Sequence, residues 1–396
     1  MMDEESILTI TVFIALFALV SGRLQRGILT PPMVFTVFGL LISPYVLNVM
    51  STLPDSGLIH TLAEITLILV LFTDAARIDL SQLRREHNIP IRLLIIGMPL
   101  TIIIGALLAA GFFTELSLWE CAVLAIILAP TDAALGQAVV SSPKVPVRIR
   151  QALNVESGLN DGIALPVLLI FLSLSSVTDH SGSASYWWLF TAKQMLLYLA
   201  GICVGYVGAK LILISSKHNW VTDTFRDISI LTFSFIAYFA AEKIGGNGFI
   251  AAFVAGLTLG NTAKGLCTCL YEFAETEGQL LNLTVFLFFG ATMVPCSPDY
   301  ATPMVLFYGL LSLTLARMLP VITSLAGSGL RWETKIFLGW FGPRGLASLL
   351  FALLVVEHSE LAHRQEILMI VLTTVLMVFF CTAPVQMPVL LYTRKF

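Results

Sequence analysis

The chain of 396 residues is poor in charged side chains, which make up 12% of it, against roughly 25% in soluble proteins. Hydrophobic residues make up 57%, and the mean hydropathy is +0.89. A soluble protein of this composition could not cover its apolar surface with polar side chains. The net charge of −3 disfavours nucleic acid as a partner. The composition therefore predicts an all-α, polytopic membrane protein whose surroundings are the lipid bilayer.

Sequence motifs of ATP-driven pumps and of common hydrolases are missing as well. No G-x-x-x-x-G-K-[ST] loop occurs, and the short connections between apolar stretches leave no room for a nucleotide-binding domain. Neither G-x-S-x-G nor H-E-x-x-H occurs, and the six histidines lie in loops or at the ends of apolar stretches, where we expect them to be solvated. We expect a protein that is not an enzyme, needs no cofactor and draws its energy from ion gradients.

We expect the six cysteines to form no zinc or disulfide framework. The pair Cys267 and Cys269 has neither a second pair nor a nearby histidine, so packing is the simpler interpretation. The acidic start, with Asp3, Glu4 and Glu5, is unlike a secretory signal. We expect the first apolar run to be retained as a helix.

Apolar stretches between polar breaks predict about thirteen membrane-spanning helices. They cover residues 7–22, 32–50, 58–76, 91–113, 117–141, 149–174, 188–214, 227–243, 247–261, 277–295, 301–327, 332–356 and 365–391. Alternate connections hold most of the lysines and arginines, and short cytoplasmic loops collect these residues. This pattern predicts an integral, multi-pass protein of the plasma (inner) membrane, with the N-terminus outside and the C-terminus cytoplasmic.

Six charged side chains lie inside the apolar stretches, where each costs about 2.5–3.5 kcal/mol on insertion scales. They are Glu64, Asp132, Glu156, Asp161, Arg317 and Arg344. Buried ion pairs that only orient helices are one interpretation. So many charges among polar neighbours favour an ion pathway.

The densest polar segment is Asn154-Val-Glu-Ser-Gly-Leu-Asn-Asp-Gly162. On a helix Ser157 and Asp161 are four residues apart and share a face, and Glu156 and Asn160 form a second such pair. A carboxylate and a hydroxyl on one face suit a small cation. We expect Asp161 to bind either a proton or a metal ion.

Two of the apolar stretches carry an interruption. Pro130 precedes Thr131 and Asp132, and Gly339-Trp-Phe-Gly-Pro-Arg-Gly345 interrupts a stretch of the second half. Unwound backbone at membrane depth survives where it faces protein or a watery cavity. Paired interruptions in two halves indicate an inverted-repeat transporter.

In such a transporter, stretches 1–6 and 8–13 would form the repeats, and Arg344 would balance surplus carboxylates where the two broken helices cross. A simple proline kink at Pro130 and snorkelling of Arg344 to the headgroups are the alternatives.

These motifs resemble the monovalent cation:proton antiporters of the NhaP and NHE type. The resemblance is carried by Ala129-Pro-Thr-Asp-Ala133, Glu156-Ser-Gly-Leu-Asn-Asp-Gly162, Glu242-Lys-Ile-Gly-Gly-Asn-Gly-Phe-Ile-Ala-Ala-Phe-Val-Ala-Gly256 and Gly342-Pro-Arg-Gly345. It implies sodium/proton exchange and cation transport in pH homeostasis, by a homodimer at the cell membrane. The family often has proline where this chain has Ala133.

The resemblance also implies roles for single residues. Asp161, Ser157 and Thr131 would hold the monovalent cation, with Glu156 as a supporting carboxylate or arginine partner. We count Asp132 among the candidate cation- and proton-binding residues.

Further residues would support the cation-binding residues. Glu64 would hydrogen-bond Asn160, and Asn at position 160 resembles the electroneutral branch, which exchanges one cation for one proton. Arg344 and Arg317 would supply positive charge. Sodium is the expected cation, with lithium or potassium also compatible.

The implied domain organisation has four parts. Residues 1–90 would give N-terminal helices of an interface domain, 91–175 the first half of the transport core, 176–300 a linker helix with the remaining interface helices, and 301–396 the second half of the core. A cation channel or uniporter that uses the same carboxylates is the alternative function, although acids that form no ring disfavour it.

Overall fold

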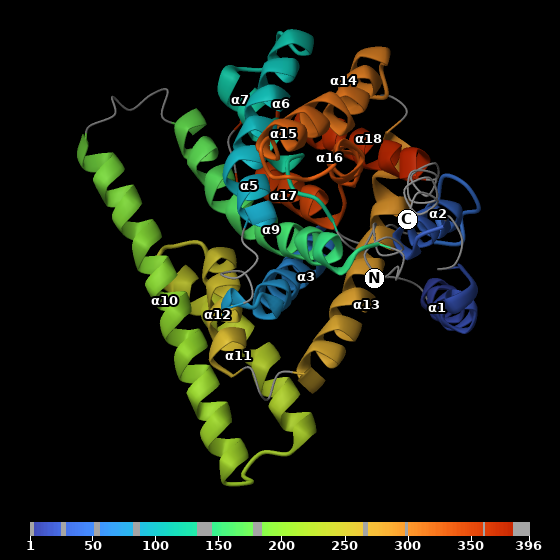
Figure 1. Cartoon of the computed structure of the whole chain (residues 1–396). Helices are drawn as coiled ribbons and strands as arrows, with labels where there is room; N and C mark the ends of the chain where they lie inside the picture. The colour runs from blue at the N-terminus through green and yellow to red at the C-terminus, as the bar shows by residue number, and fades with distance from the viewer. Residues whose placement is uncertain are drawn as a thin grey trace. The chain divides into compact units, whose positions relative to one another are not determined.

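The computed structural model of the chain describes residues 4–24, 29–50, 56–81, 88–132, 145–176, 184–263, 268–297, 300–358 and 361–382, and every regular element in these ranges is a helix (Figure 1). In chain order the elements are α1 (Glu4–Leu24), α2 (Pro31–Ile42), α3 (Ser56–Arg77), α5 (Asn88–Arg92), η1 (Leu93–Gly97), α6 (Met98–Phe112), α7 (Leu118–Ile127), α9 (Val147–Ser176), α10 (Ala184–Lys217), α11 (Asp223–Lys243), α12 (Gly248–Thr262), α13 (Thr268–Thr292), η3 (Val294–Cys296), α14 (Pro303–Leu313), α15 (Leu315–Ser324), α16 (Trp332–Trp340), α17 (Leu346–His358) and α18 (Arg364–Thr382). Ala133 and Cys267, on which expectations were placed, lie outside the described residues.

Each of the thirteen apolar stretches contains helix, which confirms the all-α class. Within the described ranges, seven helices are long and apolar enough to cross a membrane, and shorter apolar helices accompany them. The number of thirteen crossings stays a prediction.

Both expected interruptions are present. α7 starts with a capping box in which Ser117 and Glu120 each bond the other's backbone N–H, and it ends at Ile127, shortly before Pro130. α16 and α17 are separated by five non-helical residues around Pro343. Proline lacks the amide hydrogen and clashes with the preceding turn, so neither helix continues through it.

The chain groups into two compact units, which are described separately. Unit 1 comprises Met1–Ala63, Asn88–Ser157 and Leu281–Phe396, and unit 2 comprises Glu64–His87 and Gly158–Leu280. The interface and transport domains inferred from the resemblance stay a prediction.

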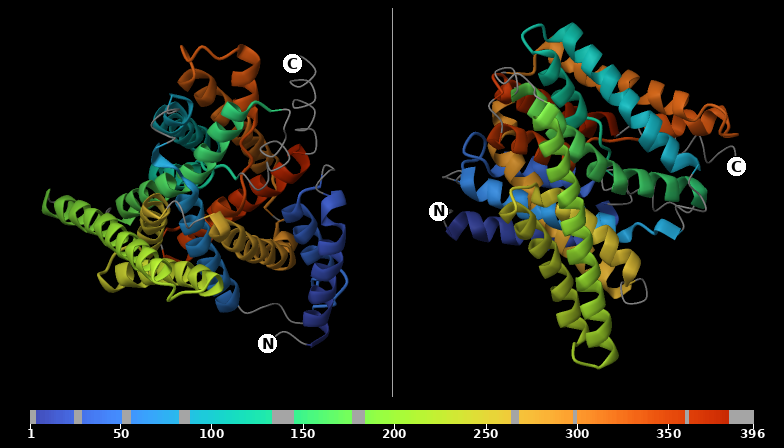
Figure 2. Two further views of the ribbon diagram at one scale, coloured as in Figure 1. Left: turned by 60° about the horizontal axis from the view of Figure 1, so that its bottom comes forward. Right: turned by 90° about the vertical axis from the view of Figure 1, so that its left-hand side faces the viewer.

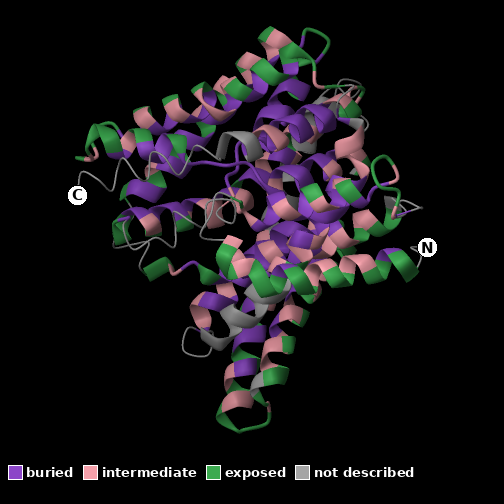
Figure 3. Ribbon diagram, turned by 90° about the vertical axis from the view of Figure 1, so that its right-hand side faces the viewer, coloured by how far each residue is buried: buried purple, intermediate pink, exposed green. Residues whose placement is uncertain are grey.

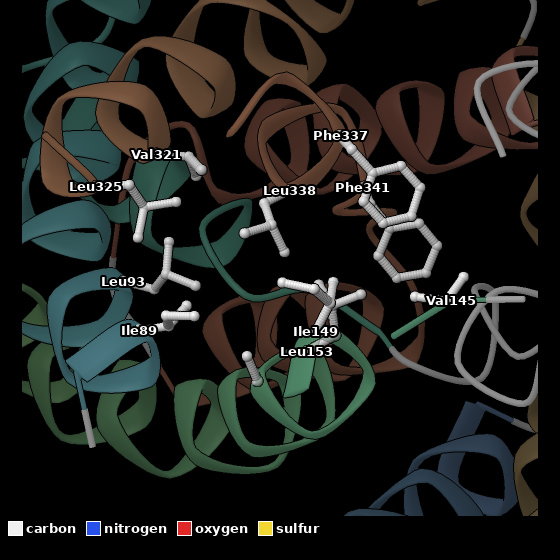
Figure 4. Packing of buried hydrophobic residues seen from close by; sticks show 11 residues of the cluster. Ile89, Leu93, Val145, Ile149, Leu153, Val321, Leu325, Phe337, Leu338 and Phe341 are labelled. Atoms are coloured by element: carbon white, nitrogen blue, oxygen red, sulfur yellow. The ribbon is translucent and has the colours of Figure 1, made fainter. Parts of the chain in front are cut away.

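The core of unit 1 joins α5, η1, α9, α15 and α16 (Figure 4). Its buried residues are Ile89, Leu93, Val145, Ile149, Ala152, Leu153, Val321, Leu325, Phe337, Leu338 and Phe341. Leu153 lies one turn before Glu156, Val321 one turn after Arg317, and Phe341 directly before Gly342. The packing therefore fixes the helices that carry the polar residues.

Unit 2 is built on α10, α11 and α12, with α10 and α11 running side by side (Figure 2). Its core consists of Phe72, Ala209, Ile212, Ile230, Ala237, Ala255, Leu259 and Ala263. Small residues let α12 approach α3 closely: a β-carbon on Gly256 would overlap the carbonyl oxygen of Phe72.

The surface of α1 is mostly exposed or half-buried (Figure 3), although the helix is strongly apolar. Leu8, Leu16 and Leu19 are exposed there. In water such a face would be unfavourable, whereas lipid tails or another apolar surface accept it.

Two of the histidines, each about a third exposed, contact acids of distant segments. His60 Nε2 contacts the carboxylate of Glu357. His363 Nδ1 lies 3.2 Å from both carboxylate oxygens of Glu120, and the His363 N–H donates to Oε1 at 3.1 Å. The sequence could not predict these partners, because pairing between distant helix ends leaves no local pattern.

The approach of α3 and α12 predicts a stability effect at Gly256. Gly256→Ala forces the two backbones apart, and we expect it to lower the free energy of unfolding by about 1–3 kcal/mol. Thermal unfolding of the purified protein in detergent, followed by tryptophan fluorescence, measures this. Gly111→Ala in α6 is the control, because a β-carbon there meets nothing within 4 Å. Equal melting temperatures for the two variants would contradict the prediction.

Candidate functional site

The two interruptions in unit 1 are bonded to each other. The backbone N–H of Asp132 donates to the carbonyl oxygen of Pro343 at 2.8 Å. In return, Asp132 Oδ2 accepts a 3.1 Å hydrogen bond from the N–H of Leu346, the first residue of α17. Asp132 thus caps α17 as an N-cap side chain would, although it comes from a segment far away in the chain. Gly345 is needed beside it, since a β-carbon there would overlap Oδ2.

Arg344 binds backbone carbonyls at the same place. Its Nε donates to Leu128 O at 2.7 Å, Nη1 to Gly342 O at 2.6 Å and Nη2 to Ser312 O at 3.1 Å. The side chain is 0% exposed, which is incompatible with snorkelling. Carbonyls in the last turn of a helix lack intrahelical partners. Arg344 satisfies these groups at the ends of α7 and α14, and its expected role in balancing carboxylates stays a prediction.

Glu156 and Arg317 form a buried ion pair in unit 1. Arg317 Nη2 lies 2.6 Å from Glu156 Oε1, and each side chain is 4% exposed. α9 carries Glu156 and α15 carries Arg317, and the core of unit 1 packs both helices together. Of the two roles considered for Glu156, its observed contact is that of an arginine partner.

Ser157 joins α9 to the interruption after α7. Its hydroxyl donates to the carbonyl oxygen of Thr131 at 2.7 Å. Asp161 follows Ser157 by four residues on the same helix, so the two side chains share a face of α9. Asp161 is half-buried and Asn160 is buried. The structure therefore brings Thr131 and Ser157 together, one helical turn before the Asn-Asp pair.

Glu64 has a partner that the sequence did not suggest. In unit 2 the hydroxyl of Tyr238 donates to Glu64 Oε1 at 2.6 Å. A tyrosine inside an apolar stretch carries no distinctive signal, because most such residues only fill space. The expected hydrogen bond between Glu64 and Asn160 stays a prediction.

The buried pair predicts that Glu156→Gln is strongly destabilising. Removing one member leaves the Arg317 guanidinium uncompensated, which costs about 3–5 kcal/mol. We expect thermal unfolding in detergent at a clearly lower temperature, and partial recovery in the double variant Glu156→Gln/Arg317→Met.

The matched control for this prediction is Glu357→Gln. Glu357 pairs with His60 at a more exposed position, and its loss should cost at most about 1 kcal/mol. If Glu156→Gln lowered the free energy of unfolding no more than this control does, the pair of Glu156 and Arg317 would not stabilise the protein as predicted.

Known proteins share both the sequence pattern and the fold. A family model described as "Sodium/hydrogen exchanger, transmembrane" matches residues 9–389. The K(+)/H(+) antiporter NhaP2 of Shewanella baltica is 24% identical over 301 residues, which are 75% of this chain and 51% of that protein. The K(+)/H(+) antiporter NhaP of Alkalimonas amylolytica is 24% identical over 338 residues, 85% of this chain and 57% of that protein. The chain thus spans about half the length of the curated relatives it matches.

The fold is similar to that of the sodium proton antiporter MjNhaP1 from Methanocaldococcus jannaschii. The structure at pH 8 covers 95% of this chain and 98% of its own, with a TM-score of 0.74 and 20% sequence identity. A second structure of the same protein gives a TM-score of 0.76. The resemblance drawn from the motifs is confirmed, and because the family model spans most of the sequence, the chain belongs to the sodium/hydrogen exchanger family.

Proposed function

We propose that the protein is a secondary active antiporter that exchanges a monovalent cation for a proton by alternating access. The observation that carries this proposal is the bond from Ser157 to Thr131, one turn before Asp161 on α9. A carboxylate, a hydroxyl and carbonyl oxygens are hard ligands that suit alkali cations. Relatives described as K(+)/H(+) antiporters support the reaction class.

In this proposal Asp161 takes either the cation or a proton, and Ser157 and Thr131 add neutral oxygens. Glu156 and Asp132 support the site, since the former pairs with Arg317 and the latter caps α17. Competition for one carboxylate couples the two ions. Sodium is the proposed substrate, and lithium and potassium use the same ligands.

The remaining expectations belong to the same proposal. The protein would act as a homodimer in the plasma (inner) membrane, with its N-terminus outside and its C-terminus cytoplasmic. Residues 91–175 and 301–396 would form the transport core, and residues 1–90 and 176–300 the interface and linker helices.

Replacement of Asp161 tests the assignment. We expect Asp161→Asn to abolish cation-dependent pH changes in inverted vesicles, because the amide can neither take up a proton nor balance a cation. The control is Asp79→Asn, since Asp79 lies beyond the end of α3 and caps the turn to Ser81. Exchange that persists in Asp161→Asn while both proteins are present in equal amounts would refute the role of Asp161.

A second experiment tests stoichiometry and ion choice. One cation exchanged for one proton moves no net charge, so an imposed voltage should leave the initial rate in proteoliposomes unchanged. Assays with sodium, lithium and potassium chloride rank the cations. Rates that follow the voltage would contradict 1:1 exchange, and cation flux without proton movement would indicate a channel or uniporter.

A further inference from the structure

A histidine near the start of α3 meets an acid at the end of α17. His60 Nε2 contacts the carboxylate of Glu357, and the two side chains are 31% and 43% exposed. Both residues belong to unit 1. In the proposed domain organisation, His60 lies in the interface part that covers residues 1–90, and Glu357 lies in the transport core. The contact therefore joins two parts to which different roles are assigned.

Polar contacts described above lie within one or the other of these parts. The bond between Asp132 and Leu346 joins two segments of the proposed core, and the bond between Tyr238 and Glu64 joins two segments of the proposed interface part. In alternating access, domains move relative to each other. A contact within one part can persist through the cycle, whereas a contact between the two parts belongs to one state of it.

α17 connects the contact at Glu357 with the interruption that precedes this helix. Asp132 binds the N–H of Leu346 at the start of α17, and Glu357 is the last residue but one at its other end, about 17 Å away along the helix axis. The side chains between them are mostly buried, and α17 packs against α18 and α7. A helix held in this way moves as one piece, so a displacement of the interruption displaces Glu357 as well.

The exposure of His60 and Glu357 suits a contact that breaks and re-forms. A pair that water reaches contributes little free energy, because each partner is solvated when the pair separates. Glu156 and Arg317, both within the proposed core, are each 4% exposed and are costly to separate. The pair between the two parts can therefore open in every cycle, and the pair within the core cannot.

The proposed topology places the contact on the outer side of the membrane. α3 begins after the second apolar stretch, and α17 ends with the twelfth. With the N-terminus outside, the connections at both places are external. The contact thus holds the interface part and the core together at their outer ends.

From these observations we propose that His60 and Glu357 form an outer gate. The gate is closed while the cation site faces the cytoplasm, and it opens when the site faces the outside. The inference rests on the proposed function, from which it takes alternating access and the domain organisation. It adds one identified contact that must break in each cycle, between two side chains outside the cation site.

A second contact between a histidine and an acid offers a matched comparison. The side chain of His363 is 33% exposed, close to the value for His60, and it contacts Glu120. This contact also lies on the outer side in the proposed topology. However, it joins the start of α18 to α7, and both helices belong to the proposed core. It should therefore stay closed throughout the cycle.

Crosslinking tests whether the outer gate must open. His60→Cys/Glu357→Cys, in a background whose native cysteines are replaced by alanine, is joined by a short bifunctional methanethiosulfonate that a reductant cleaves. We expect cation-dependent pH changes in proteoliposomes to slow about ten-fold or more on crosslinking, since a closed gate blocks the conformational step, and to recover after reduction. Glu120→Cys/His363→Cys is the control and should keep most of its rate. Each rate is compared with that of the same variant before crosslinking.

Removal of the contact gives a second test, in the protein with its native cysteines. His60→Ala should favour the outward-facing state, so the ratio of the cytoplasmic to the external KM for the cation should rise by up to about five-fold. Glu357→Ala should have the same effect, and the double variant should add nothing further. Everted and right-side-out vesicles give the two KM values.

The results separate the outer gate from the proposed function, which the Asp161→Asn assay decides on its own. Exchange at an unchanged rate in crosslinked His60→Cys/Glu357→Cys would overturn the gate and leave the proposed function standing. An equal loss of exchange in the crosslinked control would overturn it too, since joining any two outer segments would then block transport. An unchanged KM ratio in His60→Ala has the same consequence. So do thiols that the reagent fails to join, because the two positions then do not meet.

Discussion

The mutual bonding of two interrupted helices is the constraint on which the rest of the site depends. Within a bilayer no water satisfies free backbone groups, so a helix can end there only if protein atoms replace the lost partners. Asp132 provides an acceptor for the N–H of Leu346, and Arg344 provides donors for carbonyls of α7 and α14. Both have the sign that complements the helix dipole: the acid is at an N-terminus and the cation at C-terminal ends. Each interruption thus stabilises the other.

Three of the intramembrane acids, Glu156, Asp132 and Glu64, are compensated in different ways. Glu156 has a full positive charge beside it, and Asp132 has the partial charge of a helix end. Glu64 has a neutral hydroxyl. A carboxylate fully neutralised by arginine has little to gain from a metal ion, while one bonded to a hydroxyl still attracts cations and protons. The observed pairing of Glu156 with Arg317 therefore joins α9 to α15.

The sequence predicted the helices and the interruptions because both are local properties. Apolar length determines where a helix can span lipid, and Pro130 and Pro343 break helices through their own geometry. The partners of the buried charges were less accessible. Asp132 and Leu346 are 214 residues apart, and the contact from Arg344 to Ser312 depends on how α14 packs. The bond from Tyr238 to Glu64 joins residues 174 positions apart and had no local signal either.

The charges of the residues around the two interruptions bear on the proposed ratio of cations to protons. Asp132, Glu156, Arg317 and Arg344 are two acids and two arginines, so their formal charges cancel. These four residues therefore need no bound ion for charge balance, and in the proposed function the carboxylate that takes the cation is a further one. Asp161 is such an acid, one turn after the serine that bonds Thr131. If that carboxylate alternates between one proton and one monovalent cation, its net charge is zero in both loaded states. The loaded site then moves at equal electrostatic cost in both directions, whereas the empty, charged site meets the desolvation penalty of the membrane. That difference is the physical reason why a site of the proposed kind would exchange the two ions rather than let either diffuse freely.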